Sequence, residues 1–554
     1  MKILLAACNA KYIHSNPAVY DLKAYAAAYK DSVQIKEFTI NQPKDEIMKE
    51  IYRSGADVVC FSCYIWNISF VRELIRDLKK ILPDTVFWAG GPEVSFHAKN
   101  FLEDMPQVTG IMKGEGEETF LALAGYYLEG KGRLEEISGI VFRKENEIVD
   151  NGFREPVDLD RIPFIYENPE NFENRIIYYE SSRGCPFSCS YCLSSIDRKL
   201  RFRSLSLVKK ELQFFLDHRV PQVKFVDRTF NCRHEHAMEI WKYILEHDNG
   251  VTNFHFEVSA DLFREDELEL IGRMRPGLIQ LEIGVQSANP ETLEAVHRKT
   301  DLEKLRRNVE KIRSFHSVHQ HLDLIAGLPC EDYESLRRSF DFVYSMKPDQ
   351  LQLGFLKVLK GSLMEEKARE YGITCKSLEP YEVFSTRWIS YEEILKLKTV
   401  ESMVEVYYNS GQFQYTLNWL TGFWEDAFSF YEDLGRFYER KGYEELSHSR
   451  IRRYEILLEF LHEKPEISVA EAAGRMVYDL YLRENLKKRP SFAADQKPYE
   501  KAVWSYRKEH QVPKTAHIEV FSDGTAVLFD YDRRDPLSHN ARSERICLPA
   551  DSMI

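Results

Sequence analysis

The sequence lacks the features of a membrane or secreted protein. It contains no run of about 20 apolar residues, which is the length that a membrane-spanning helix requires. The apolar stretch at residues 3–8 is too short for the core of a signal peptide, and the polar residues Asn9 and Lys11 follow it. We therefore interpret this stretch as a buried first strand and expect a cytoplasmic protein without a membrane segment.

The sequence also lacks an excess of basic residues over acidic ones. The 554 residues include 75 Lys and Arg against 88 Asp and Glu, so the net charge is −13. A general nucleic-acid binder is expected to present a basic surface, and this balance argues against nucleic acid as a partner. Cysteine is also sparse for a disulfide framework. Seven of the ten cysteines are scattered and three stand close together, which fits a reducing cytoplasm.

Residues 2–128 alternate short apolar stretches with amphipathic ones. In residues 69–82, for example, apolar side chains recur at helical spacing. Strands are expected at residues 2–7, 33–38, 57–61, 85–89 and 108–112. Alternation of strands and helices predicts a doubly wound, flavodoxin-like (Rossmann-like) parallel sheet in a domain of residues 1–150. Its ligands would lie at the carboxyl ends of the strands.

The rest of the chain divides into three parts. Residues 151–174 contain three prolines and little periodicity, which indicates a linker. Residues 175–360 contain six strand–helix units, which predict a partial (β/α)6 barrel of the TIM type. Its strands are expected at residues 176–181, 222–226, 253–258, 278–283, 322–325 and 350–355. Residues 361–554 are mainly helical in pattern, and an Asp-Gly turn near the end predicts a β-hairpin. The predicted fold class of the whole chain is α/β, with a mainly α-helical C-terminal domain.

Three cysteines follow the first expected barrel strand. Cys185, Cys189 and Cys192 have the spacing Cys-x3-Cys-x-aromatic-Cys. Three thiolates on a short loop can hold three irons of a [4Fe–4S] cluster and leave the fourth iron open to a small chelating molecule. The alternative is a zinc site, but zinc usually takes four ligands in paired groups, and no matching second pair follows.

At these residues the chain resembles the radical S-adenosylmethionine (SAM) superfamily. The resemblance implies that the open iron chelates SAM and that the cluster splits it into methionine and a 5′-deoxyadenosyl radical. The three cysteines would then be both the metal ligands and the catalytic centre. Tyr191, between two of them, would shield the cluster and contact adenine, or would serve only in packing.

Several later strand ends resemble the SAM-binding pattern of the same superfamily. Asp227 ends the second strand and would accept hydrogen bonds from the ammonium group of SAM, and Glu257 ends the third and would bind its ribose or methionine part. Gln286 and Ser287 end the fourth and would face the ribose or the substrate. The segment 323–329 resembles one that packs near adenine. Each residue alone has the alternative of a satisfied polar group in the core, and the order of the segments strengthens the resemblance.

Two glycine-containing turns in the first domain resemble those of the cobalamin (B12)-binding radical SAM class. The first turn contains Gly90, Gly91 and Glu93, and the second contains Gly114 and Glu115. Consecutive glycines after a strand let a backbone approach a ligand closely. The resemblance implies that these turns line the groove for the nucleotide tail of cobalamin, and ordinary tight turns are the alternative.

The Asp-x-His-x-x-Gly motif that places a histidine below cobalt is absent. His14 lies in the appropriate loop, but its context does not match that motif. In relatives the loop that contains Ser62, Tyr64 and Trp66 runs under the corrin, so Tyr64 or Trp66 would cover the lower face without binding cobalt. Trp66 has packing in the core as its alternative.

The resemblance implies a cobalamin-dependent radical SAM enzyme, in the first place a methyltransferase acting on an unactivated carbon or phosphorus. The alternatives are a non-methylating rearrangement, cyclisation or oxidation with the same cofactors, and a non-enzymatic iron–sulfur or cobalamin sensor. The expected partners are a small-molecule or peptide substrate and an electron donor such as flavodoxin or ferredoxin. Residues 361–554 resemble a domain of unknown function, whose aromatic residues would form a core or a substrate cover.

Overall fold

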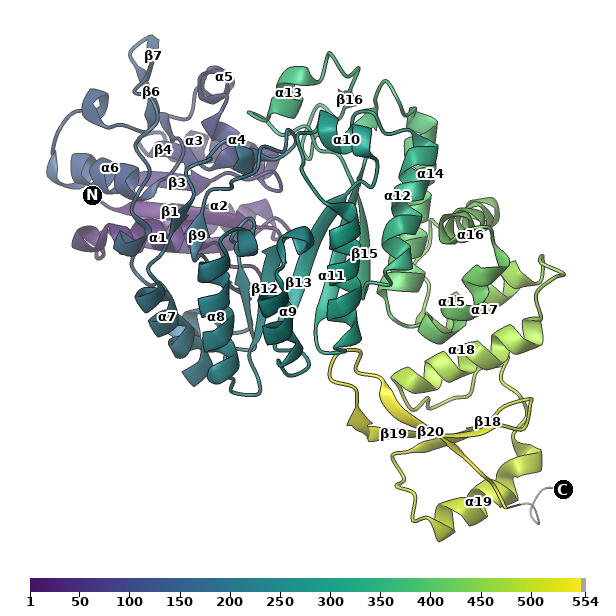
Figure 1. Cartoon of the computed structure of the whole chain (residues 1–554). Coiled ribbons are helices and arrows are strands. Elements are labelled where there is room, and N and C mark those ends of the chain that lie inside the picture. Colours follow the sequence, from purple (N-terminus) through teal and green to yellow (C-terminus); the bar gives the residue numbers. More distant parts are fainter. Residues whose placement is uncertain (550–554) are drawn as a thin grey trace.

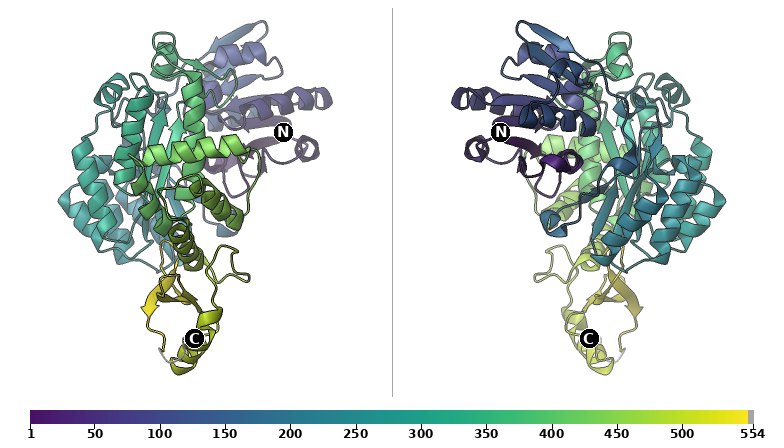
Figure 2. Two further views of the ribbon diagram at one scale, coloured as in Figure 1. Left: turned by 90° about the vertical axis from the view of Figure 1, so that its right-hand side faces the viewer. Right: turned by 90° about the vertical axis from the view of Figure 1, so that its left-hand side faces the viewer.

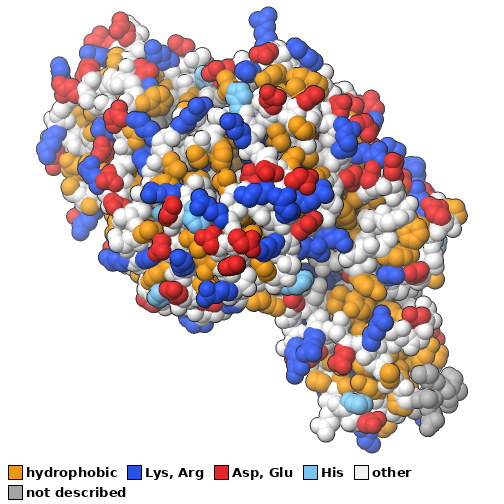
Figure 3. Space-filling view, viewed as in Figure 1, with side chains coloured by type: hydrophobic (Ala, Val, Ile, Leu, Met, Phe, Trp, Pro, Cys, Tyr) orange, Lys and Arg blue, Asp and Glu red, His pale blue; other side chains and the backbone are white. Residues whose placement is uncertain are grey.

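The structure, a computed structural model, describes residues 1–549. A sheet-centred N-terminal part, a six-stranded barrel and a helical C-terminal part follow one another along the chain (Figure 1). The last strands and helix α19 project from the remainder as a separate lobe (Figure 2). Basic and acidic side chains are interspersed over the face in Figure 3. None of the helices in residues 1–549 has the length and apolarity to cross a bilayer.

The N-terminal sheet has the strand order β2-β1-β3-β4-β5-β6-β7, and its first five strands are parallel. The strands are β1 (Ile3–Asn9), β2 (Val33–Thr39), β3 (Val58–Ser62), β4 (Val86–Gly90), β5 (Gly110–Met112), β6 (Ile140–Lys144) and β7 (Glu147–Asp150). The helices are α1 (Pro17–Tyr25), α2 (Lys44–Ser54), α3 (Ile68–Ile81), α4 (Pro92–Ser95), α5 (Ala98–Asp104) and α6 (Glu117–Glu129). The order 2-1-3-4-5 is that of flavodoxin-like folds, which confirms the predicted fold class of this part.

The barrel has the strand order β15-β14-β13-β12-β11-β8, with all neighbours parallel and no pairing of β8 with β15 among the described residues. The strands are β8 (Ile177–Tyr179), β11 (Gln222–Phe225), β12 (Asn253–Val258), β13 (Ile279–Gln286), β14 (His319–Ala326) and β15 (Gln350–Phe355). The helices are α7 (Leu205–Asp217), α8 (His234–Glu246), α9 (Glu265–Gly272), α10 (Pro290–Ala295), α11 (Leu302–Ser314) and α12 (Tyr333–Ser345). A short pair, β9 (Ser182–Arg183) and β10 (Arg201–Phe202), flanks the cysteine loop. The predicted partial barrel is thus present.

The C-terminal part is helical, with a small sheet at its end. Its helices are α13 (Leu363–Lys367), α14 (Tyr391–Met403), α15 (Gln414–Leu420), α16 (Ala427–Lys441), α17 (Arg450–Leu461), α18 (Val469–Arg483) and α19 (Glu500–Glu509). Its strands are β16 (Thr374–Cys375), β17 (Val383–Ser385), β18 (His517–Val520), β19 (Ala526–Arg534) and β20 (Ala541–Ile546). The predicted hairpin is β18–β19, and β20 adds a third antiparallel strand to it.

The barrel and the C-terminal helices share one hydrophobic core. One continuous apolar core contains barrel residues such as Phe256 and C-terminal aromatics such as Tyr407 and Phe413, whereas the N-terminal sheet has separate cores on its two faces. The aromatics of the C-terminal region therefore serve mainly in packing. The segment 151–174 is not a free spacer, because Val157 and Tyr166 within it are 4% and 3% exposed.

Candidate functional site

The cysteine loop lies between β9 and β10, at the carboxyl end of β8. Cys185, Cys189 and Cys192 line one cavity of about 190 Å³. They do not converge as the ligands of one metal ion would, and no group of three or more His, Cys, Asp or Glu in residues 1–549 does. In an iron–sulfur cluster each thiolate binds a different iron, so the three thiols need not converge on one point. Their place around one cavity is compatible with the predicted cluster.

The loop conformation depends on Gly184. Its φ is +94°, and a Cβ there would lie 2.7 Å from the carbonyl oxygen of Lys199. The amide of Cys185 donates to the carbonyl of Asp197 at 3.0 Å, so the start of the loop is held against its end. A side chain at position 184 would force these two segments apart.

The same cavity contains three of the residues predicted to bind SAM. Tyr191, Glu257 and Gln286 line it, together with Asp323 from the segment 323–329. These side chains come from the cysteine loop and from the carboxyl ends of β12, β13 and β14. The structure thus brings distant strand ends to one side of the cysteines.

Two residues predicted to contact SAM are not brought into this cavity. Asp227 is fully buried, and its carboxylate accepts hydrogen bonds from the amide of Ser181 (2.9 Å) and from the hydroxyls of Ser181 and Ser182 (both 2.6 Å). Ser287 is also fully buried and donates to Glu331 at 2.7 Å. Both act inside the barrel wall, where Asp227 fixes the start of the cysteine-bearing segment. Both side chains already have protein partners, and their contacts with SAM stay a prediction.

Arg298 is among the cavity residues that sequence reasoning missed. Its guanidinium donates to the carbonyl of Gly284, and its Nη1 lies 4.0 Å from Cys189 Sγ and 3.5 Å from the Tyr191 hydroxyl. Such a cation can stabilise a thiolate and an anionic cluster. No local motif surrounds Arg298, so only its position in space reveals it.

Glu257 has an unusual environment at the end of β12. Burial and the nearby charge of Glu282 raise the pKa of Glu257 to about 7, against the opposing influence of Arg228 and Lys224. Glu282 itself is ionised, because hydrogen bonds from His255 and Lys224 overcome its burial and hold its pKa at about 2. Of these two cavity carboxyls, Glu257 is thus the one that titrates near neutral pH.

This titration predicts a pH dependence of SAM affinity. As the pH rises through about 7, Glu257 becomes ionised and should attract the positively charged SAM more strongly. In the free protein the same raised pKa lowers stability as the pH rises from 4.5 to about 7, because the folded state must then give up a proton that the unfolded state has already lost. Anaerobic calorimetry on cluster-loaded protein should show affinity increasing from pH 6 to 8, and Glu257→Gln should remove most of that increase. A full increase in Glu257→Gln would contradict the assignment.

A second cavity, of about 490 Å³, lies at the carboxyl ends of β1, β3, β4 and β5. Its lining includes the predicted residues Ser62, Tyr64, Gly90, Gly91, Gly114 and Glu115. Apolar side chains of α1 and the strands, such as Val19, Leu22 and Met112, form much of the remaining wall. A largely apolar cavity at the strand ends suits the heterocyclic tail of cobalamin.

Three other residues of the first domain lie elsewhere. Trp66 is 41% exposed and stacks on Tyr64 with ring centroids 4.4 Å apart, so it is neither in the cavity wall nor in the core. Glu93 is buried and accepts a hydrogen bond from Tyr381 of the C-terminal part at 2.8 Å. The His14 ring contacts the hydroxyl of Tyr178 on β8 at 2.6 Å and does not line the cavity.

The two cavities adjoin. Ser194, just after the cysteines, and Arg228, just after β11, line both of them. The strand-end face of the first sheet therefore opposes the strand-end face of the barrel. A molecule between the two could be reached from both sides.

Family models identify the parts that build these cavities. Residues 3–124 match the B12 binding domain, residues 179–343 match the radical SAM superfamily, and residues 369–525 match a protein family of unknown function, DUF4080. The chain is a cobalamin-binding radical SAM protein. The first two matches confirm the expected cofactors: cobalamin for the B12 binding domain, and a [4Fe–4S] cluster with SAM for the radical SAM domain.

Similar proteins extend this comparison. The anaerobic magnesium-protoporphyrin IX monomethyl ester cyclase of Rubrivivax gelatinosus is 24% identical over 58% of this chain and 60% of its own length. The cobalamin-dependent radical SAM methyltransferase TokK of Streptomyces tokunonensis is 24% identical over 57% of this chain and 49% of its own. The chain thus spans between about half and three fifths of the length of these two relatives.

A solved structure supports the fold of the radical SAM protein. OxsB, a cobalamin-dependent SAM radical enzyme solved with aqua-cobalamin and SAM bound, superposes with a TM-score of 0.61. The two are 15% identical, and the match covers 86% of this chain and 78% of OxsB. At this identity the likeness concerns the arrangement of the domains and not the chemistry.

Proposed function

We propose that this protein is an enzyme that uses a [4Fe–4S] cluster, SAM and cobalamin to methylate an unactivated carbon or phosphorus of a small molecule. The observation that supports it most is the junction of the two cavities at Ser194 and Arg228, which brings the two proposed cofactor sites next to each other. The names of several relatives, including a hopanoid C-3 methylase of Methylococcus capsulatus, point to the same reaction type.

The residues present suit these groups. Cys185, Cys189 and Cys192 would hold the cluster, the residues around Glu257 would hold SAM, and the cavity beside Gly91 would hold cobalamin. When bound, the cluster and SAM supply a carbon-centred radical, and cobalamin supplies a transferable methyl group. The protein's own part is to bind, to orient and to exclude water.

Individual side chains have definite tasks in this proposal. Arg298 places positive charge beside Cys189 and fixes the ring of Tyr191 over the cavity. Glu257 accepts hydrogen bonds from SAM once it is ionised. The exposed Arg228, at the junction of the cavities, is placed to contact a substrate or a polar group of cobalamin.

The proposal also assigns a role to each part of the chain. Residues 1–150 bind cobalamin, residues 151–174 connect and pack, and residues 175–360 form the radical SAM barrel. Residues 361–554 were expected to cover the substrate, but none of residues 361–549 lines either cavity. We assign this part the role of supporting the barrel, because it shares the barrel's core.

A non-methylating reaction is the second candidate, because the relative from Rubrivivax gelatinosus is named as a cyclase. Anaerobic incubation of the reconstituted protein with cell metabolites, a flavodoxin or ferredoxin donor and SAM with a deuterated methyl group distinguishes the two. Methylation predicts a deuterated product together with S-adenosylhomocysteine. A product without deuterium, formed with 5′-deoxyadenosine alone, would establish the second candidate, and no 5′-deoxyadenosine at all would point to a sensor.

A further inference from the structure

The acidic residues of the two glycine turns make contacts that influence the distance between the two cofactor sites. Glu115 lines the second cavity, yet its carboxylate already has three protein partners. It accepts from the amide of Val157 at 2.8 Å and pairs with Arg201 (Nη1–Oε2, 3.1 Å) and Arg183 (Nη1–Oε2, 3.5 Å). A carboxylate with these partners has little capacity left for a ligand.

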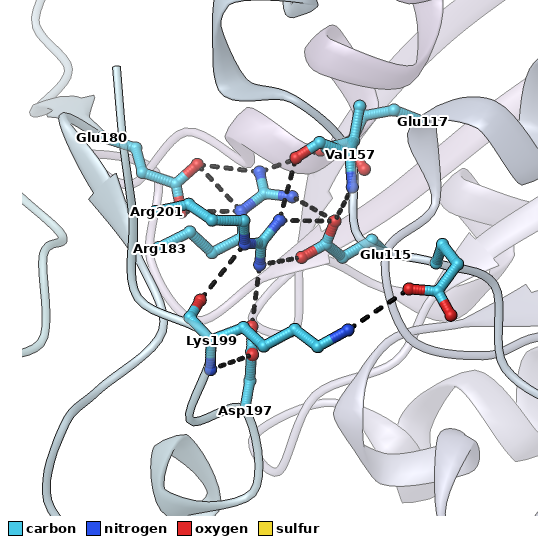
Figure 4. Close-up of polar contacts among 9 residues, drawn as sticks. Glu115, Glu117, Val157, Glu180, Arg183, Asp197, Lys199 and Arg201 are labelled. Carbon is cyan, nitrogen blue, oxygen red and sulfur yellow. Dashed lines mark hydrogen bonds and ion pairs between the residues drawn. The ribbon is translucent and has the colours of Figure 1, made fainter. Parts of the chain in front are cut away.

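The two arginines belong to the strands that frame the cysteine loop. Arg183 lies on β9, two residues before Cys185, and Arg201 lies opposite it on β10. Arg183 also pairs with Glu117 at 2.9 Å and with Glu180 at 2.7 Å. Figure 4 shows both guanidinium groups between Glu180 on one side and Glu115 on the other.

The network is partly withdrawn from water and joins segments distant in sequence. The side chains of Arg183, Arg201 and Glu115 are 18%, 19% and 21% exposed, and that of Glu117 is 7% exposed. Arg201 also donates to Asp197 at 2.8 Å, and the carbonyl of Asp197 accepts from the amide of Cys185. A continuous chain of contacts thus runs from the 114–117 turn to the first cysteine.

A second tie lies at the other glycine turn. Glu93 accepts from the Tyr381 hydroxyl at 2.8 Å and lies 3.6 Å from the Lys360 ammonium, while the amide of Ser69 donates to Glu379 at 2.8 Å. One contact between two bodies would leave a hinge. These two contacts, one at the cysteine loop and one at the segment after β15, add to the contact of His14 with Tyr178 and restrict rotation of the N-terminal sheet over the barrel.

We infer that Glu115 and Glu117, with Arg183 and Arg201, are positioning residues that clamp the cobalamin-binding turn to the strands carrying the cluster loop, and that Glu93 with Tyr381 forms the second point of this clamp. Glycine and glutamate in these turns then have separate tasks, since glycine shapes the turn and glutamate sets the distance between the two cofactor sites. A displacement of about 1 Å can cost about 10²-fold in rate, so such a clamp has a clear use. The inference rests on the proposed function, because it requires both cofactors to bind.

The test measures that distance directly. Full-length protein is loaded with both cofactors, reduced to cob(II)alamin and the paramagnetic cluster, and studied by pulsed electron paramagnetic resonance. Wild type should give one narrow distribution of distances between the two centres. Glu115→Gln should broaden it while iron and cobalamin contents stay at wild-type levels. Glu118→Gln is the matched control, because Glu118 pairs with Arg154 and Arg161 and not with the cluster-loop strands.

Arg201→Gln breaks the same contact from the other side and decides the question if Glu115→Gln does not fold. A narrow distribution retained in the folded variants would overturn the clamp. So would loss of cobalamin from Glu115→Gln without broadening in the loaded fraction, because Glu115 would then be a cofactor ligand. Wild-type protein that takes up iron but no cobalamin would refute the proposed function and the clamp together, whereas loaded protein with unchanged distances refutes the clamp alone.

Discussion

Replacing Cys185, Cys189 and Cys192 together with alanine should lower the iron content of anaerobically reconstituted protein from about four per chain to background. The physical reason is that no other thiol in the described residues 1–549 lines the 190 Å³ cavity, so no substitute thiol ligand is at hand. The same variant should release no 5′-deoxyadenosine from SAM. Iron analysis, absorbance near 400 nm and product chromatography, with a detection limit about 10³-fold below wild-type turnover, measure the loss.

Cys232→Ala is the matched control for that variant. Cys232 is a partly buried cysteine whose pKa is raised by burial and by the nearby charge of Cys185, but it does not line the cavity. It should retain full iron content and SAM cleavage. A triple variant that still bound four irons, or a control that lost them, would show that the cluster is held elsewhere.

Gly91→Ala should reduce cobalamin binding to a small fraction of the wild-type level. Gly91 has φ +110° and ψ 174°, a region that is almost exclusive to glycine, and its Cβ would lie 2.5 Å from the carbonyl oxygen of Cys63. The turn must therefore move away from the end of β3, and both segments line the cobalamin cavity. A side chain at position 91 would therefore meet the backbone of Cys63.

Cobalamin per chain, read from absorbance after gel filtration, and thermal unfolding are the measurements for Gly91→Ala. The control is Gly130→Ala at the end of α6, where φ is +67° but, apart from the adjoining backbone, no atom of residues 1–549 lies within 4 Å of the added Cβ. It carries only the left-handed backbone cost of about 1–2 kcal/mol and should bind cobalamin normally. Equal cobalamin binding by the two variants would show that the turn at Gly91 does not shape the site.

The sequence predicted most strands because apolar runs mark buried strands. Among the six barrel strands the main shortfall was β14, which begins at His319 and was expected only from residue 322. Its first residues are polar, and His321 pairs with Asp323 in the polar interior of the open barrel. Apolar patterning cannot detect a strand whose inner face lies in such a polar environment.

Prediction of the site from the sequence has a similar limit. The cysteines and the glycine turns could be found from local spacing, because each motif lies within a few residues. The ion pair of Glu115 with Arg201 joins residues 86 apart, and Arg298 reaches Cys189 across 109 residues. The first contact depends on the packing of the two domains and the second on the fold of the barrel, and no local pattern describes either of them.

The most direct test of the account is one anaerobic incubation of full-length protein loaded with iron, sulfide and cobalamin, together with SAM and a low-potential reductant. We predict about one cobalamin and four irons per chain and steady release of 5′-deoxyadenosine. Omitting the reductant should stop that release. Protein that takes up neither cofactor, or that takes up both and forms no 5′-deoxyadenosine under reduction, would contradict the central claim that the two adjoining cavities form a cobalamin-dependent radical SAM active site.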